Sequence, residues 1–374
     1  MGAESKVIEF KCSSCGGSMQ SSGHSNGKVV CPWCNTECVI DGLIKNAEIL
    51  AKENINSGVS IDLEKKVLNS KVIDALTSTG STFPLDILES GTVVMKKHIC
   101  VPAYLFYCNG MASYTYEVAV ERERTSGGEV KGNKVKYTTE TYTEWLPMGG
   151  TATTSGSVIV SGNRNYTEII NRIYAGYNAN NLVDIESLVL PTDVETLSFN
   201  LPQPAAFSEY VNPRMEAMLV ASAENTLHGK KYRNFTLGGC NVQKSEVLRL
   251  SLGIYQIAFQ YNGKIYTLFM AGDGSAYYWD EQPVDQERVR FYEDKIAAEK
   301  KRAKSPFLVL AIICTVLAFF TYGIALLPGG LFGYLHFKRK SERKNIQTEI
   351  DAFIAEANNK KQQFVQNGRT ISGL

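Results

Sequence analysis

Residues 11–38, KCSSCGGSMQSSGHSNGKVVCPWCNTEC, hold two Cys-x-x-Cys pairs that are separated by fifteen residues. Two residues between cysteines let a tight turn aim both thiolates at one ion, and four thiolates suit the tetrahedral coordination of Zn²⁺. The spacing predicts a zinc ribbon whose metal ligands are Cys12, Cys15, Cys31 and Cys34. Because cysteine fills all four positions, we expect Zn²⁺ to be a structural cofactor here, with no coordination position left for a substrate.

The residues around the four cysteines fit a ribbon. VIEFKC and GKVVC are typical of strands that lead into the two turns. Cys38 follows the last pair and is interpreted as a small buried hydrophobic residue rather than a ligand. Trp33 stands between Cys31 and Cys34 and has two interpretations: an exposed anchor for a protein partner, or a side chain packed against the facing turn.

Charge bears on the nucleic-acid function that many ribbons have. Up to residue 45 the four lysines Lys6, Lys11, Lys28 and Lys45 are balanced by four acids, Glu4, Glu9, Glu37 and Asp41. This balance removes the electrostatic attraction that dominates nucleic-acid affinity, so nucleic acid is not the expected partner. The whole chain of 374 residues has a net charge of +1 and gives no further sign of a polyanionic partner.

The N-terminus MGAESKVIEF lacks the apolar core of a secretory signal, and nine cysteines, an odd number, make a poor disulfide framework. We therefore expect the ribbon to remain in a reducing compartment.

The longest apolar run is PFLVLAIICTVLAFFTYGIALL, residues 306–327. As a helix it would be about 33 Å long, enough to cross a hydrocarbon core of about 30 Å. The sequence therefore predicts a transmembrane segment, with membrane lipid as a partner and the cell membrane as the location. Basic residues flank the run on both sides, so orientation is not decided by them. A single crossing with the N-terminal 300 residues in the cytosol is preferred, and a re-entrant hairpin is the alternative.

Between the ribbon and this run, the chain is rich in Thr, Tyr, Val and Gly, which indicates antiparallel β structure. Asn109-Gly110 and Asn262-Gly263 each separate two strand-like stretches and predict two tight hairpins. The segment NPRMEAMLVASAENTLHGKKY, which begins at residue 212, has helical apolar spacing and is expected to cap one sheet face.

The C-terminal tail has an apolar stripe at helical spacing, formed by Ile346, Ile350, Phe353, Ile354 and Ala357. Such a stripe needs a partner in water, and three partners are open: another protein's helix, a bilayer surface, or the segment VRFYEDKIAAEKKRAK that precedes the apolar run.

Together these patterns predict a multidomain α+β protein with an N-terminal zinc ribbon, an antiparallel β-rich domain with capping helices, a C-terminal transmembrane segment and a helical tail. The expected segments are a ribbon (1–42), a helical connector (43–80), a β-rich α+β domain (81–285), a basic juxtamembrane helix (286–305), the transmembrane segment (306–337) and an amphipathic tail (338–374).

No sequence pattern points to catalysis. The four histidines are far apart, and the chain has no H-E-x-x-H, G-x-S-x-G, phosphate-binding loop or dinucleotide fingerprint. We expect a protein that is not an enzyme, and no small-molecule substrate is identified.

The order of the segments, with FPLDILES, ICVPAYLFYCNG, YTEWLPMGGTATTSGSVIVSG and YQIAFQYNGKIYTLFMAGDGSAYY after the ribbon, is similar to that of bacterial membrane-anchored proteins with a TFIIB-type zinc ribbon. The resemblance covers residues 10 to about 335; the chain departs from the family at Leu146, where Arg is common, and in its longer tail. Members of this family are associated with phage-shock-protein-A-like and flotillin-like (SPFH-domain) proteins in envelope stress. The resemblance therefore implies a scaffold that recruits such partners to the membrane. The alternative is a zinc-ribbon nucleic-acid-binding protein of replication or transcription type.

Overall fold

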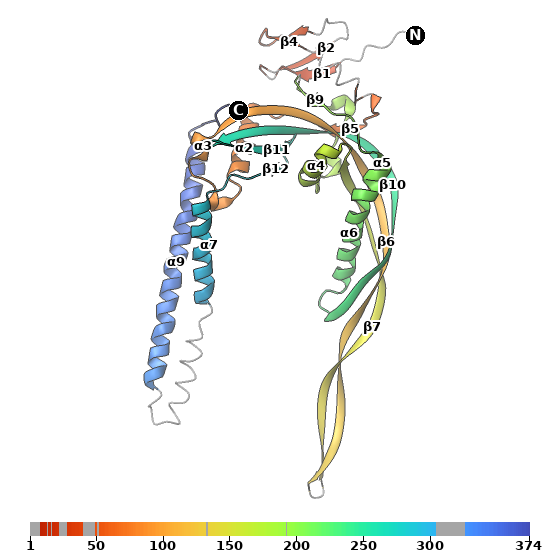
Figure 1. The fold of residues 1–374 in the computed structure, drawn as a ribbon, viewed down its shortest axis with the longest axis vertical. Helices are drawn as coiled ribbons and strands as arrows, with labels where there is room; N and C mark the ends of the chain where they lie inside the picture. The colour runs from red at the N-terminus through yellow and green to blue at the C-terminus, as the bar shows by residue number, and fades with distance from the viewer. Residues whose placement is uncertain are drawn as a thin grey trace. The chain divides into compact units, whose positions relative to one another are not determined.

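The computed structural model describes residues 8–12, 14–15, 17–21, 28–39, 49–50, 52–131, 134–191, 193–303 and 326–374. Its helices are α2 (Lys65–Leu76), α3 (Ile87–Ser90), α4 (Thr167–Ile173), α5 (Gln203–Ala206), α6 (Asn212–Thr226), α7 (Gln286–Ala303) and α9 (Leu326–Gln366) (Figure 1). Its strands are β1 (Ile8–Lys11), β2 (Ser18–Ser21), β3 (Lys28–Val30), β4 (Glu37–Val39), β5 (Ser57–Val59), β6 (Thr92–Lys131), β7 (Lys134–Ser161), β8 (Val183–Asp184), β9 (Glu195–Thr196), β10 (Tyr232–Tyr261), β11 (Lys264–Ala271) and β12 (Tyr277–Trp279).

The chain forms two compact units, and each is assembled from three separate stretches. Unit 1 consists of Met1–Asp62, Lys97–Tyr255 and Met270–Tyr278. Unit 2 consists of Leu63–Lys96, Gln256–Phe269 and Trp279–Leu374. The long strands β6 and β10 therefore contribute residues to both units.

The sheet of unit 1 is mainly antiparallel. β6 and β7 pair from Ala103 opposite Ser161 out to Lys131 opposite Lys134, and β10 pairs with β6. Two short strands add parallel pairs: β5 lies beside β10 and β9 beside β6. The fold is thus α+β, as the composition predicts.

One of the two predicted hairpins is wrong. Asn109 and Gly110 lie within β6, opposite Ser155 and Thr154, so no turn forms there. Gly110 has a packing role instead, because a Cβ atom at this position would lie 3.2 Å from Leu219 Cδ1 of α6. The second prediction is confirmed in unit 2: Asn262 (φ 49°) and Gly263 (φ 76°) connect β10 and β11 in the left-handed backbone region that a two-residue hairpin turn requires.

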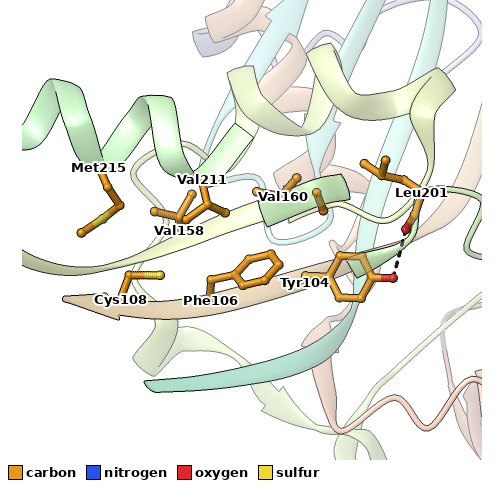
Figure 2. Packing of buried hydrophobic residues seen from close by; sticks show 9 residues of the cluster. Tyr104, Phe106, Cys108, Val158, Val160, Leu201, Val211 and Met215 are labelled. Carbon is orange, nitrogen blue, oxygen red and sulfur yellow. Dashed lines mark hydrogen bonds between the residues drawn. The ribbon is translucent and has the colours of Figure 1, made fainter. Parts of the chain in front are cut away.

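The predicted capping helix is present as α6, which packs on β7 in unit 1. Its buried residues Met215, Leu219 and Ala223 recur every four positions and form one apolar stripe. Figure 2 shows Met215 and Val211 beside Phe106 and Cys108 of β6 and the valines of β7. The hydroxyl of Tyr104 donates a hydrogen bond to the Leu201 carbonyl at 3.0 Å, which satisfies the polar group of this otherwise apolar core (Figure 2).

A wider helical turn, Phe207–Val211, joins α5 to α6 in π-helical geometry. Pro213, at the start of α6, has no backbone N–H and cannot donate to a residue of the preceding turn. The missing donor is a physical reason for the irregular turn at this point.

In unit 2, α7 packs against α9. The Phe353 ring lies 4.9 Å from the Phe291 ring, and the Arg288 guanidinium lies 4.0 Å above the same Phe353 ring. Ion pairs follow the seam: Arg288 with Glu356 at 2.9 Å, Arg343 with Glu299 at 2.7 Å, and Lys295 with Glu349. Of the three partners open for the apolar stripe of the tail, the structure shows the helix that precedes the apolar run.

The end of α9 is also fixed within unit 2. Gly368 has φ 61°, and Arg369 N–H donates to the Phe364 carbonyl, which closes the helix in a Schellman motif. The buried Asn69 side chain of α2 then holds the last residues: it donates to the Arg369 carbonyl and accepts from Ile371 N–H. The C-terminus is therefore an integral part of this unit.

The structure does not agree with the predicted C-terminal transmembrane segment. Within the described ranges, every helix is too short or too polar to cross a membrane. The predicted fold class with a transmembrane segment and the predicted single-pass location at the cell membrane are therefore wrong.

The helix pairing gives a physical reason. A single crossing would separate α7 and α9, whereas these helices contact each other. Residues 304–325, which include most of the apolar run and on which the re-entrant alternative depends, lie outside the described residues.

Candidate metal centre

Each Cys-x-x-Cys pair lies at the turn of a short antiparallel hairpin. β1 pairs with β2 around the first pair, and β3 pairs with β4 around the second. The turns close in the same way: Cys12 N–H donates to the Gly17 carbonyl and Cys31 N–H to the Thr36 carbonyl, both at 2.9 Å. Thus two hairpins, each folded by local hydrogen bonds, present two thiols apiece.

The backbone of the second turn requires a residue that tolerates positive φ. Asn35 has φ 56° and donates its N–H to the Cys31 carbonyl at 2.9 Å. Asparagine adopts this left-handed conformation more readily than most residues do. The residue type directly after the cysteine pair is therefore part of what aims the two thiols in one direction.

The structure brings the four predicted ligands together. The Sγ atoms of Cys12, Cys15, Cys31 and Cys34 all lie within 4.8 Å of one another. Two pairs link the hairpins at 3.6 Å, Cys12 with Cys34 and Cys15 with Cys31. A tetrahedron with Zn–S bonds of about 2.3 Å has S–S edges of about 3.8 Å. The four thiols therefore fit a tetrahedral metal ion, and the group can hold one.

The electrostatic surroundings favour the metal-binding form of one thiol. The Thr36 hydroxyl, 3.2 Å from Cys34 Sγ, and the Thr36 backbone N–H lower the pKa of Cys34 to about 6. A thiolate, rather than a thiol, is the ligand of a metal ion. The spacing of the cysteines does not point to Thr36. The sequence signal that could have identified this residue is a hydroxyl side chain two positions after a cysteine pair.

Cys38 lies closer to the centre than its sequence position suggests. Its side chain is 3% exposed, as expected for a small buried residue. Its Sγ atom is 3.7 Å from Cys12 Sγ, which matches the spacing between the predicted ligands themselves. Cys38 belongs to the same buried cluster as Cys12, Cys31 and Met19.

Trp33 is packed against the facing turn, as one of its two interpretations predicts, and the other interpretation, an anchor for a protein partner, stays a prediction. Its side chain is 75% exposed. Its indole nevertheless rests on the facing turn, because a Cβ atom at Gly17 would lie 2.4 Å from Trp33 Cδ1. The indole Nε1 also donates to the Ser18 carbonyl at 3.4 Å. The ring is thus both held by the ribbon and open to solvent.

Outside the ribbon, a polar groove is lined by residues of β6, β7 and β10. Its volume is about 680 Å³, and its lining contains no charged side chain. The lining residues are Asn109, Gly110, Met111, Thr153, Thr154, Ser155, Asn241 and Gln243. This set contains no metal-ligating cluster or nucleophile with a base, so within the part of the chain that the structure describes the cysteine group is the candidate site.

Comparison of the chain with protein-family models, curated proteins and solved structures found no match.

Proposed function

We propose that this chain is a zinc-ribbon interaction protein, in which one Zn²⁺ holds the ribbon in shape and the ribbon binds a protein partner. The observation that carries the proposal is the group of four thiols within 4.8 Å of one another. Four cysteines with no other candidate ligand in the group suit a closed structural site. In a module as small as this one, coordination supplies much of the folding free energy.

Trp33 supports a protein partner. The contact with Gly17 and the hydrogen bond to Ser18 limit the motion of the indole, so little conformational entropy remains to be lost on binding. Burying about 150 Å² of this ring at ~25 cal/mol per Å² would contribute roughly 3–4 kcal/mol before the entropic terms. Val30, three residues before Trp33 in the chain, is 57% exposed and is a second exposed apolar side chain of the ribbon.

The charges of the ribbon favour protein over nucleic acid. Lys28, one of the four lysines, pairs with Glu37 at 2.9 Å across β3 and β4. The Glu37 carboxylate lowers the positive potential that Lys28 offers to a phosphate. The family resemblance suggests phage-shock-protein-A-like or SPFH-domain proteins as the partners to test first.

A photo-crosslinker next to Trp33 would test this proposal. We would place a photoreactive phenylalanine analogue at Pro32 of the full chain, in cells that normally make the protein, and identify adducts by mass spectrometry. The expected result is a discrete protein adduct that disappears in Trp33→Ala and in Cys15→Ser chains. The same probe at the exposed Lys66 of α2 is the matched control and should give no such adduct.

Two results would contradict the proposal. One is an adduct that nuclease removes and that requires Lys28, which would support the nucleic-acid alternative. The other is the same protein adduct from both Pro32 and Lys66, which would place the contact outside the ribbon.

A further inference from the structure

The ribbon contains five buried or clustered thiols, although a tetrahedral ion takes four. The fifth, Cys38, lies on β4 opposite Val29 of β3. It is 3% exposed, and its Sγ atom is 3.7 Å from Cys12 Sγ. The distance from Cys12 Sγ to Cys34 Sγ is 3.6 Å. The Cys12 thiol therefore lies almost equally far from Cys34, a predicted ligand, and from Cys38 on β4.

Cys38 is not part of the group in which every Sγ atom lies within 4.8 Å of every other. With the four ligands in place, it is therefore a neighbour of Cys12 rather than a fifth ligand. Cys12 and Cys38 are both buried, whereas Cys15 and Cys34 are exposed. If Cys12 Sγ leaves its position, the buried Cys38 thiol is 3.7 Å from the place it occupied.

We propose that Cys38 is a replacement ligand for Cys12, an inference that rests on the proposed zinc site. In the exchange, Cys38 Sγ bonds to the metal and releases its proton to solvent. The bond from Cys12 Sγ breaks, and the Cys12 thiolate takes up a proton. Four thiolates coordinate before and after the exchange, and no electrons are transferred. The site thereby keeps its metal when Cys12 is alkylated, oxidised or substituted.

The proposal separates two ligands that sequence spacing treats as equal. Loss of Cys12 should be tolerated because Cys38 lies 3.7 Å away, whereas loss of Cys15 should not be. Cys15→Ser is therefore the matched control for Cys12→Ser. Cys38→Ser alone should leave the metal in place, because the four ligands are intact.

The test uses the purified full chain with these single variants and the double variant Cys12→Ser/Cys38→Ser. Zinc affinity is measured by competition with a chromophoric chelator, and the number of thiolate ligands by the charge-transfer absorption of the Co²⁺-loaded chain. We expect Cys12→Ser to weaken zinc binding less than about 10-fold and to keep a four-thiolate cobalt spectrum. Cys15→Ser and the double variant should weaken binding more than about 100-fold.

Alkylation provides a second measurement. In zinc-loaded Cys12→Ser chains, Cys38 should be protected from iodoacetamide and become reactive when the metal is removed. If Cys12→Ser loses zinc as completely as Cys15→Ser does, through misfolding or otherwise, the proposal is overturned. It is also overturned if Cys12→Ser keeps zinc with a three-thiolate spectrum that Cys38→Ser does not change. Failure of the parent chain to bind zinc would instead contradict the proposed function.

Discussion

Gly17 illustrates how one residue serves two structural needs. Its carbonyl accepts the hydrogen bond that closes the first turn, and its missing side chain leaves room for the Trp33 indole. The sequence places two glycines directly after Cys15, where a turn needs backbone freedom. The contact with Trp33 is not predictable from sequence, because it depends on the second hairpin, sixteen residues further along the chain.

Substituting Gly17 should therefore have an effect that depends on Trp33. In Gly17→Ala, the new Cβ atom would lie 2.4 Å from Trp33 Cδ1, so the indole must move. We expect a red-shifted Trp33 emission and a loss of about 1–2 kcal/mol in ribbon stability. In a Trp33→Ala background the same change should be nearly neutral. An equal loss in both backgrounds, measured as zinc affinity in a double-mutant cycle, would contradict this contact.

The clustering of the four cysteines was predictable because the information for it is local. Two residues between cysteines determine which way both thiols can point, whatever the rest of the chain does. Cys38 and Thr36 were not recognised as neighbours of the site, because their roles depend on how β4 pairs with β3.

At the level of elements, the two Asn-Gly pairs show the limit of a local turn signal. Asn262-Gly263 forms a turn where β10 ends and β11 begins. Asn109-Gly110 is extended because residues on both sides continue to find partners in β7. Strand length is set by the partner strand, and that information is absent from the dipeptide.

The hairpin turn can be tested with two glycines in open surroundings. A Cβ atom at Gly263 or at Gly239 meets no atom within 4 Å, but only Gly263 has positive φ, 76°. We expect Gly263→Ala to lower the free energy of unfolding by about 1–2 kcal/mol. Gly239→Ala, on β10, should leave it unchanged or raise it by up to about 1 kcal/mol. Equal effects in urea denaturation would show that positive φ is not the cause.

The pairing of α7 with α9 also goes beyond what periodicity can decide. The stripe Ile346, Ile350 and Ala357 is buried as its spacing requires. Which surface covers the stripe depends on the tertiary fold. The spacing of apolar residues shows that a helix face is buried, but it does not identify the surface that buries it. The ring and ion-pair contacts of Phe353 and Arg288 identify α7 as that surface.

A zero-length carbodiimide crosslink would test this pairing. Lys295 of α7 and Glu349 of α9 form an ion pair, so coupling should join them through an amide bond. Lys361 and Asp74, 2.8 Å apart in the same unit, serve as the positive control. We expect both crosslinks in the mass spectra of the digested full chain, and loss of the first one only in Glu349→Gln. A chain that forms the Lys361–Asp74 product alone would contradict the packing of α7 on α9.

At the scale of the whole molecule, the net charge of +1 gives no broad electrostatic field, so recognition must depend on local surfaces. The α+β class was predictable from composition and periodicity. The assembly of each unit from three stretches was not, because pairs such as β5 with β10 join residues that are far apart in the sequence. The ribbon is the exception, since its residues are close together in the chain.

The central claim is that Cys12, Cys15, Cys31 and Cys34 bind one zinc ion, and metal content measures it most directly. The full chain should be purified under reducing conditions without chelators and analysed by native mass spectrometry alongside Cys15→Ser. We predict one zinc per parent chain, little or none in Cys15→Ser, and local unfolding of residues 8–40 in that variant, seen as faster hydrogen exchange. Well under one zinc per parent chain, or equal zinc in both chains, would contradict the account.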